Sequence, residues 1–66
     1  MNIILNGDAH TLKTAQNIDA FLQDQGYNGK LVAVAMNGAF VPKSTYASTT
    51  INDGDKIEIV APMQGG

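Results

Sequence analysis

The sequence predicts an α+β domain in which a mixed sheet of four or five strands packs on one helix. Three observations favour this class. Apolar and polar residues alternate in several short runs, one segment has apolar residues at helical spacing, and turn residues separate these segments. With 66 residues, we expect a single domain over residues 1–66, in which residues 62–66 form a flexible functional tail.

The first segment, MNIILNGDAHTLK, is typical of a β-hairpin. Ile3 and Leu5 fall on one face by alternation, and Asn6-Gly7 accepts the positive φ angles of a type I′ turn. We therefore expect the first two strands to be antiparallel, with Leu12 turned inward at the end of the second.

The next segment, NIDAFLQDQG, predicts the helix. Ile18, Phe21 and Leu22 have the i, i+3, i+4 spacing of one apolar stripe. Asn17 is a suitable N-cap, and Gly26 is a suitable stop. A single short stripe indicates a helix that packs against a sheet.

The remaining segments predict further strands. Residues 31–36 form an apolar run with valines, and because this run is apolar on both faces we expect both faces to be covered. Pro42 cannot donate a ladder hydrogen bond, so we expect a short edge piece there and then an irregular crossing. In NDGDKIEIV, Ile57 and Ile59 alternate with Glu58 and predict the last strand.

Composition excludes several functions. With 44% apolar and 15% charged residues the chain is too apolar to be disordered, and it contains no run of the roughly 18 apolar residues that a membrane span needs. Four scattered lysines and a net charge of −2 argue against nucleic acid as a partner. Without a recognisable signal segment or any cysteine, we expect a cytoplasmic protein that has no membrane partner and no thiolate chemistry of its own.

Candidate catalytic and metal-binding residues are few. Asp8 and His10 could be drawn as an acid-base pair, but no nucleophile is placed with them, and a solvated surface histidine is the simpler interpretation. Asp53 and Asp55 flank a turn glycine without the ligand pattern of a calcium loop. The sequence therefore predicts no catalytic residue, no metal and no bound cofactor.

The last residues raise a different possibility. Met63, Gln64, Gly65 and Gly66 follow a proline and have no apolar periodicity. We expect them to project as an arm that carries the α-carboxylate. Because glycine lacks a Cβ atom, such an arm could enter a narrow active site of a partner enzyme.

The stretches VAVAMNGAFVPKS and DGDKIEIVAPMQGG, the chain length and the terminal Gly-Gly resemble the ThiS family of thiazole-biosynthesis sulfur carriers, which belongs to the ubiquitin-like β-grasp group. The resemblance covers essentially the whole chain and is strongest over residues 32–66. It implies a β-grasp fold and a carrier, not an enzyme. A ThiF-type adenylyltransferase would use ATP to adenylate the carboxylate of Gly66, and a sulfur donor such as a cysteine desulfurase would displace AMP. The resulting thiocarboxylate would deliver sulfur to a ThiG-type thiazole synthase.

Carried over residue by residue, the resemblance makes Gly66 the residue whose carboxylate is adenylated and then accepts sulfur. Gly65 is the narrow residue that leads to it, and Gln64 and Met63 belong to the tail that enters the partner's active site. Two further positions can be compared with the family. Lys43 stands where the family often has arginine, and Tyr46 stands where a bulky aromatic residue is common; we interpret both as structural.

The partner surface is predicted from alternation alone. Val60 lies on the opposite face of the last strand from Ile57 and Ile59. Together with Phe40 and Met63, it is our candidate for an apolar surface near the tail.

Three alternatives stay open at this point. The small subunit of molybdopterin synthase uses the same Gly-Gly chemistry with a different final acceptor. A ubiquitin-like modifier would join Gly66 to lysines through isopeptide bonds. In a toxin-antitoxin or scaffold-type binding module, the tail would be idle.

Overall fold

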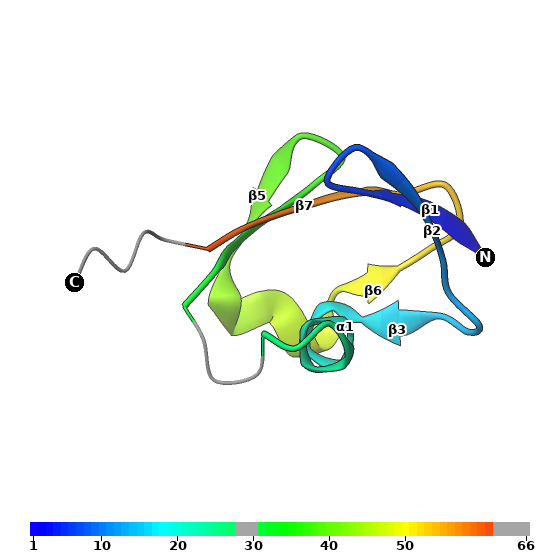
Figure 1. Ribbon diagram of the computed structural model, residues 1–66. Helices are drawn as coiled ribbons and strands as arrows, with labels where there is room; N and C mark the ends of the chain where they lie inside the picture. Colours follow the sequence, from blue (N-terminus) through cyan, green and yellow to red (C-terminus); the bar gives the residue numbers. More distant parts are fainter. Residues whose placement is uncertain (28–30, 62–66) are drawn as a thin grey trace.

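The structure is a computed structural model that describes residues 1–27 and 31–61. Figure 1 shows a main sheet as an upper layer, with the helix and a short second ladder beneath it. In chain order the elements are β1 (Asn2–Leu5), β2 (Asp8–Thr11), β3 (Gln16–Asn17), α1 (Ile18–Asp24), β4 (Ala33–Met36), β5 (Ala39–Val41), the 3₁₀ helix η1 (Lys43–Ser48), β6 (Thr50–Ile51) and β7 (Lys56–Val60).

The main sheet has five strands in the order β2-β1-β7-β4-β5. Strands β1 and β7 are parallel, and the other neighbouring pairs are antiparallel. The sheet is therefore mixed and has the C-terminal strand at its centre, which confirms the predicted fold class. Strands β3 and β6 form a separate two-residue antiparallel ladder.

Both hairpins of the sheet turn at an Asn-Gly pair. Asn6 and Gly7 have φ angles of 50° and 86°, and Asn37 and Gly38 have φ angles of 53° and 85°. Positive φ at both central residues is the requirement of a type I′ turn, whose twist matches that of the strands. The predicted first hairpin is confirmed, and a second of the same kind joins β4 to β5.

The helix forms where the apolar stripe and the cap predict it. The Asn17 side chain accepts a hydrogen bond from the Ala20 backbone N–H at 2.7 Å, which satisfies one of the free donors of the first turn. Ile18, Phe21 and Leu22 are buried. Gly26, with a φ of 86°, follows the helix and provides the left-handed residue that ends it.

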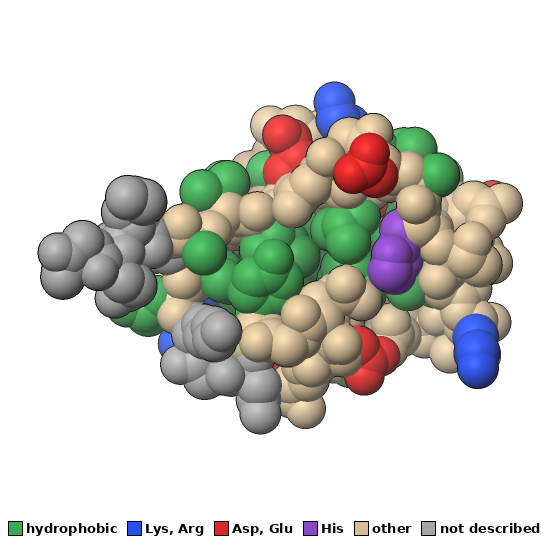
Figure 2. Space-filling model, viewed as in Figure 1, with side chains coloured by type: hydrophobic (Ala, Val, Ile, Leu, Met, Phe, Trp, Pro, Cys, Tyr) green, Lys and Arg blue, Asp and Glu red, His purple; other side chains and the backbone are tan. Residues whose placement is uncertain are grey.

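The core lies between α1 and one face of the sheet. Ile57 and Ile59 of β7 are buried, as predicted, and the central position of β7 places them over the helix. Figure 2 shows apolar side chains gathered between the upper and lower layers. The fully buried members of the core with the largest side chains are Phe21, Ile3, Ile18, Ile51, Ile57 and Val34.

Two predictions about the middle of the chain need correction. The expected coverage of both faces of the strand over residues 31–36 is wrong, because Leu31 is 68% exposed and Ala33 is exposed. A single short helix covers one face of a sheet only. The crossing after Pro42 is more regular than expected, because it consists of η1 followed by β6, where Ile51 is fully buried.

The short edge piece before Pro42 is confirmed as β5, which has three residues and lies at the edge of the sheet. Within the part of the chain that the structure describes, no helix has the length and apolarity that crossing a membrane requires.

Candidate functional site

The predicted tail residues Met63, Gln64, Gly65 and Gly66 lie outside the described residues, as does Pro62. The described chain ends at Ala61, directly after β7. The site is therefore built from the end of β7 and from the surface around it.

The end of β7 lies beside an exposed apolar surface on the face of the sheet opposite the helix. Val60 is 63% exposed and is the register partner of Ala33 on β4. Phe40 is 70% exposed and is the register partner of Ala35, also on β4. We call these four residues, Ala33, Ala35, Phe40 and Val60, the outer apolar patch.

Alternation along the strands produces this patch. On β7, Ile57 and Ile59 face the helix, so Val60 faces outward; on β4, Val34 faces inward and is 1% exposed. Leu31, two residues before Ala33, is also largely exposed. Large contiguous apolar patches on soluble proteins often mark interaction sites, so this face is the candidate for partner binding.

One charged residue borders the patch. Glu58 is exposed and is the second register partner of Ala35. An apolar centre beside charged or polar residues is the usual anatomy of a protein interface.

The structure brings Val60 and Phe40, the two described residues of the predicted partner surface, to one face of the sheet. The sequence reasoning missed Ala33 and Ala35, which lie on the strand between them. The sequence VAVAM repeats alanine at alternate positions, and alternate positions of a strand share a face. This pattern could have predicted that Ala33 and Ala35 lie together on one face.

Tyr46 and Lys43, the two positions compared with the family, differ in their surroundings. Tyr46 is only 7% exposed, and its hydroxyl donates to the Val32 carbonyl at 3.4 Å, so it ties η1 to the segment leading into β4. Lys43 is exposed. The structural interpretation therefore fits Tyr46, and that of Lys43 stays a prediction.

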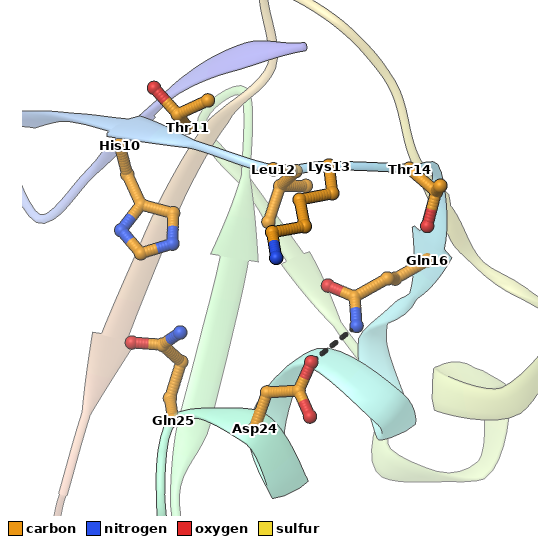
Figure 3. A pocket seen from close by; sticks show the side chains of 8 residues that line it. All are labelled: His10, Thr11, Leu12, Lys13, Thr14, Gln16, Asp24 and Gln25. Carbon is orange, nitrogen blue, oxygen red and sulfur yellow. Dashed lines mark hydrogen bonds between the residues drawn. The ribbon is translucent and has the colours of Figure 1, made fainter.

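A polar groove of about 310 Å³ lies on the other side of the molecule, between β2 and the end of α1. Figure 3 shows the side chains of His10 and Gln25 at one end of the groove and those of Gln16 and Asp24 joined by a hydrogen bond at the other. The His10 ring packs edge-on against Phe21, with ring centroids 5.7 Å apart. His10 is therefore half-buried, and the prediction of a solvated surface histidine is wrong in that respect.

The acidic residues near the last turn have structural partners. Asp53 Oδ1 accepts from the Asn2 backbone N–H at 2.6 Å, and Asp55 Oδ2 accepts from the Asn52 backbone N–H at 2.8 Å. The Asp55 contact is typical of a turn that holds its own backbone, whereas the Asp53 contact joins the turn to β1. Within residues 1–27 and 31–61, no group of three or more His, Cys, Asp or Glu side chains is arranged to hold a metal ion.

Comparison with known proteins finds a matching sequence family and similar solved structures. A sequence model of the ThiS family matches residues 3–66. The crystal structure of the thiamine biosynthesis protein ThiS from Geobacter metallireducens has a TM-score of 0.86 at 29% identity, with full coverage of both chains. A solution structure of a thiamine biosynthesis protein from the same organism gives a TM-score of 0.85, also at 29% identity, and covers all of this chain and 88% of that one.

Two curated relatives are much longer proteins. Over its full 66 residues, the chain is 41% identical to a thiazole synthase from Paramagnetospirillum magneticum and 33% identical to one from Magnetococcus marinus. In each case it spans 20% of the relative's length.

Proposed function

The chain belongs to the ThiS family, and from that premise we propose that it is a sulfur carrier for the formation of the thiazole ring of thiamin. The observation that carries this proposal is the family match over residues 3–66, which includes Gly65 and Gly66. The absence of cysteine fits such a role, because the sulfur travels on a carboxyl carbon and needs no thiol from the carrier.

The chemistry that we propose takes place on the carboxylate of Gly66. A ThiF-type adenylyltransferase directs a carboxylate oxygen to the α-phosphorus of ATP, and pyrophosphate leaves. A sulfur donor, such as a persulfide supplied by a cysteine desulfurase, then attacks the carbonyl carbon of the acyl adenylate, and AMP leaves. Reduction or thiolysis of the resulting acyl disulfide releases the thiocarboxylate. Adenylation is needed because a bare carboxylate oxygen is a poor leaving group.

The outer apolar patch supports this chemistry by giving the partner a surface to hold. Gly66 is six residues beyond Val60, so its carboxylate lies within roughly 20 Å of Val60 even for a fully extended chain. An enzyme that binds the patch therefore needs its reaction centre within that distance. Bound in this way, the carrier presents its carboxylate at a high effective concentration.

The second partner that we propose is a thiazole synthase of the ThiG type. Two proteins with that name contain a segment that matches this whole chain. A carrier and a synthase that work in sequence gain from covalent linkage, because linkage makes the transfer step intramolecular. We expect the separate chain to bind a synthase through the same outer face.

The test is the intact mass of the chain after incubation with its adenylyltransferase, ATP and a sulfur donor. We expect a mass gain equal to the exchange of one oxygen for sulfur, and no such gain for a variant that lacks Gly66. Thermal unfolding of both forms serves as the folding control. An unchanged mass under conditions that convert another ThiS protein would contradict the carrier role.

Other functions give different results in the same assays. The small subunit of molybdopterin synthase would gain the same sulfur but deliver it to a pterin, so the final acceptor separates the two carriers. A ubiquitin-like modifier would give lysine conjugates through Gly66. An idle tail would leave function unchanged when Gly65 and Gly66 are removed. The ThiS family match favours the thiazole acceptor.

A further inference from the structure

Strand β7 is held on both sides by an asparagine from an Asn-Gly turn. Asn6 follows β1 and Asn37 follows β4, the two strands that flank β7. The backbone N–H of Asn6 donates to the Ile57 carbonyl at 2.9 Å, and that of Asn37 donates to the Lys56 carbonyl at 2.7 Å. Each asparagine thus extends its ladder by one residue.

The two side chains hold β7 in different ways. Asn6 Oδ1 accepts from the Ile59 backbone N–H at 2.8 Å. Asn37 Oδ1 accepts from the Lys56 backbone N–H at 2.9 Å, and Asn37 Nδ2 also donates to Asp55 Oδ1 at 3.0 Å. The Asn37 side chain therefore donates a hydrogen bond from its NH2 group to a carboxylate. The Asn6 side chain instead accepts a hydrogen bond through its oxygen.

Asparagine followed by glycine is chemically labile. The backbone nitrogen of the glycine can attack the side-chain carbonyl carbon, because no Cβ atom on the glycine hinders the approach. The backbone nitrogen gives up its proton as the new carbon–nitrogen bond closes a five-membered imide, the side-chain carbon–nitrogen bond breaks, and the NH2 group takes up a proton and leaves as ammonia. Water then opens the imide to aspartate or to its isomer with the backbone routed through the side chain. Asparagine is accordingly a thermolabile residue.

We propose that Asn37 is a deamidation site and that the carboxylate of Asp55 makes its conversion to aspartate destabilising. In the aspartate product of deamidation, an oxygen replaces the Nδ2 donor. The new carboxylate then faces Asp55 Oδ1 at the position where a donor now lies 3.0 Å away. Two like charges replace a charge-assisted hydrogen bond, so the contact that held β4 and the start of β7 together becomes repulsive.

The folded chain protects this site until the turn opens. Asn37 is fixed by its left-handed φ of 53° and by three hydrogen bonds to Asp55 and Lys56. Attack on its side-chain carbon requires that the side chain rotate toward the Gly38 nitrogen, which breaks the side-chain bonds. Asn37 is also exposed, so water reaches the imide once it forms. Modification therefore reports the release of the Asn37 side chain from Asp55 and Lys56 and then favours further release.

Asn6 serves as an internal control for Asn37. It has nearly the same φ angle and also precedes a glycine. Its oxygen accepts a backbone N–H, and a carboxylate oxygen accepts the same bond at least as well. Conversion of Asn6 to aspartate should therefore leave the β1–β7 contact intact. The proposal does not depend on the sulfur-carrier function.

Four variants test the consequence by urea unfolding: Asn37→Asp, Asn6→Asp, Asp55→Asn and the double variant Asn37→Asp with Asp55→Asn. The double variant exchanges carboxylate and amide. An asparagine at 55 donates to the new carboxylate at 37, and its own oxygen still accepts from the Asn52 N–H, so every bond of the cluster has a partner again.

We expect Asn37→Asp to raise the unfolding equilibrium constant by roughly fivefold to tenfold, because it replaces a hydrogen bond to a charged group with a contact between like charges that water partly screens. Asn6→Asp should change it by less than about threefold. The double variant should recover most of the loss caused by Asn37→Asp. Equal losses at Asn37 and Asn6, or a double variant no better than Asn37→Asp, would overturn the role of Asp55.

The modification itself is tested by ageing the unaltered protein at mildly alkaline pH, folded and in urea, and mapping peptides by mass. The peptide with Asn37 should gain the mass of an amide-to-acid exchange several times faster in urea than in the folded protein. Asp55→Asn should speed the reaction in the folded state only. The third pair, Asn28-Gly29, lies outside the described residues, and its peptide is read separately. Equal rates for Asn37 in both states, or no reaction in either, would overturn the proposal.

Discussion

Replacing Val60 by aspartate tests most directly whether the outer apolar patch binds the partner. The side chain is 63% exposed in the free protein, so the change removes little core packing, and its effect on the unfolding free energy should be about 1 kcal/mol or less. In a complex with the adenylyltransferase, the same position would be buried. The variant therefore separates a binding defect from a folding defect.

The expected magnitude follows from the exposure. Fully burying a valine side chain contributes about 1.5 kcal/mol or more, and since roughly two thirds of Val60 is still exposed, about 1 kcal/mol remains to be gained on docking. A carboxylate buried without a partner adds a penalty of roughly 1 to 3 kcal/mol. Together these predict that kcat/KM for adenylation falls by roughly 30-fold to several hundredfold.

The assay is pyrophosphate release by the adenylyltransferase at carrier concentrations below KM. Val60→Thr, which keeps the branched shape, should lose several-fold only. Ala9→Asp is the control for charge, because Ala9 is exposed on the edge strand β2, opposite Ile4 and away from β4 and β5. If Val60→Asp folds normally and is adenylated as fast as the unaltered chain, the patch does not bind this enzyme.

Three further predictions concern stability and are read by thermal or urea unfolding. Tyr46→Phe removes only a long hydrogen bond and should cost less than about 1 kcal/mol, whereas Tyr46→Ala leaves a cavity beside the core and should cost roughly 3 kcal/mol or more. Asn17→Ala removes the helix cap and should cost about 1 kcal/mol, with Asn17→Asp as the control that keeps it. Gly38→Ala should cost about 1 kcal/mol through its φ of 85°, although nothing lies within 4 Å of the added carbon; a neutral result would mean that the turn relaxes.

Local patterns predicted the parts of the fold that local contacts determine. The cap at Asn17 and the turn at Asn6-Gly7 are decided within a few residues, and both are present as predicted. The alternation of Ile57 and Ile59 also correctly placed Val60 on the outer face. These features depend on backbone geometry and burial, which the order of residues encodes directly.

The features that sequence reasoning missed depend on contacts distant in the chain. The two-residue strands β3 and β6 exist because residues 16–17 and 50–51 lie side by side, and neither segment has enough alternation to predict a strand. The exposure of Ala33 was likewise hidden, because an apolar run does not tell which of its faces another element covers. The terminal residues that the proposed chemistry needs stay a prediction.

One face of the sheet is exposed for a physical reason, and its exposure suits the proposed role as a carrier. In the described part of the chain, α1 packs on one face of the five-stranded sheet, so apolar residues on the other face of β4, β5 and β7 remain in contact with water. A partner can approach the backbone closely over Ala33 and Ala35, while Phe40 and Val60 supply most of the apolar area that docking buries. Strand β7 contributes Val60 to this face and directly precedes the last residues in the sequence. We therefore expect that a partner bound at the patch also holds the strand from which the tail follows.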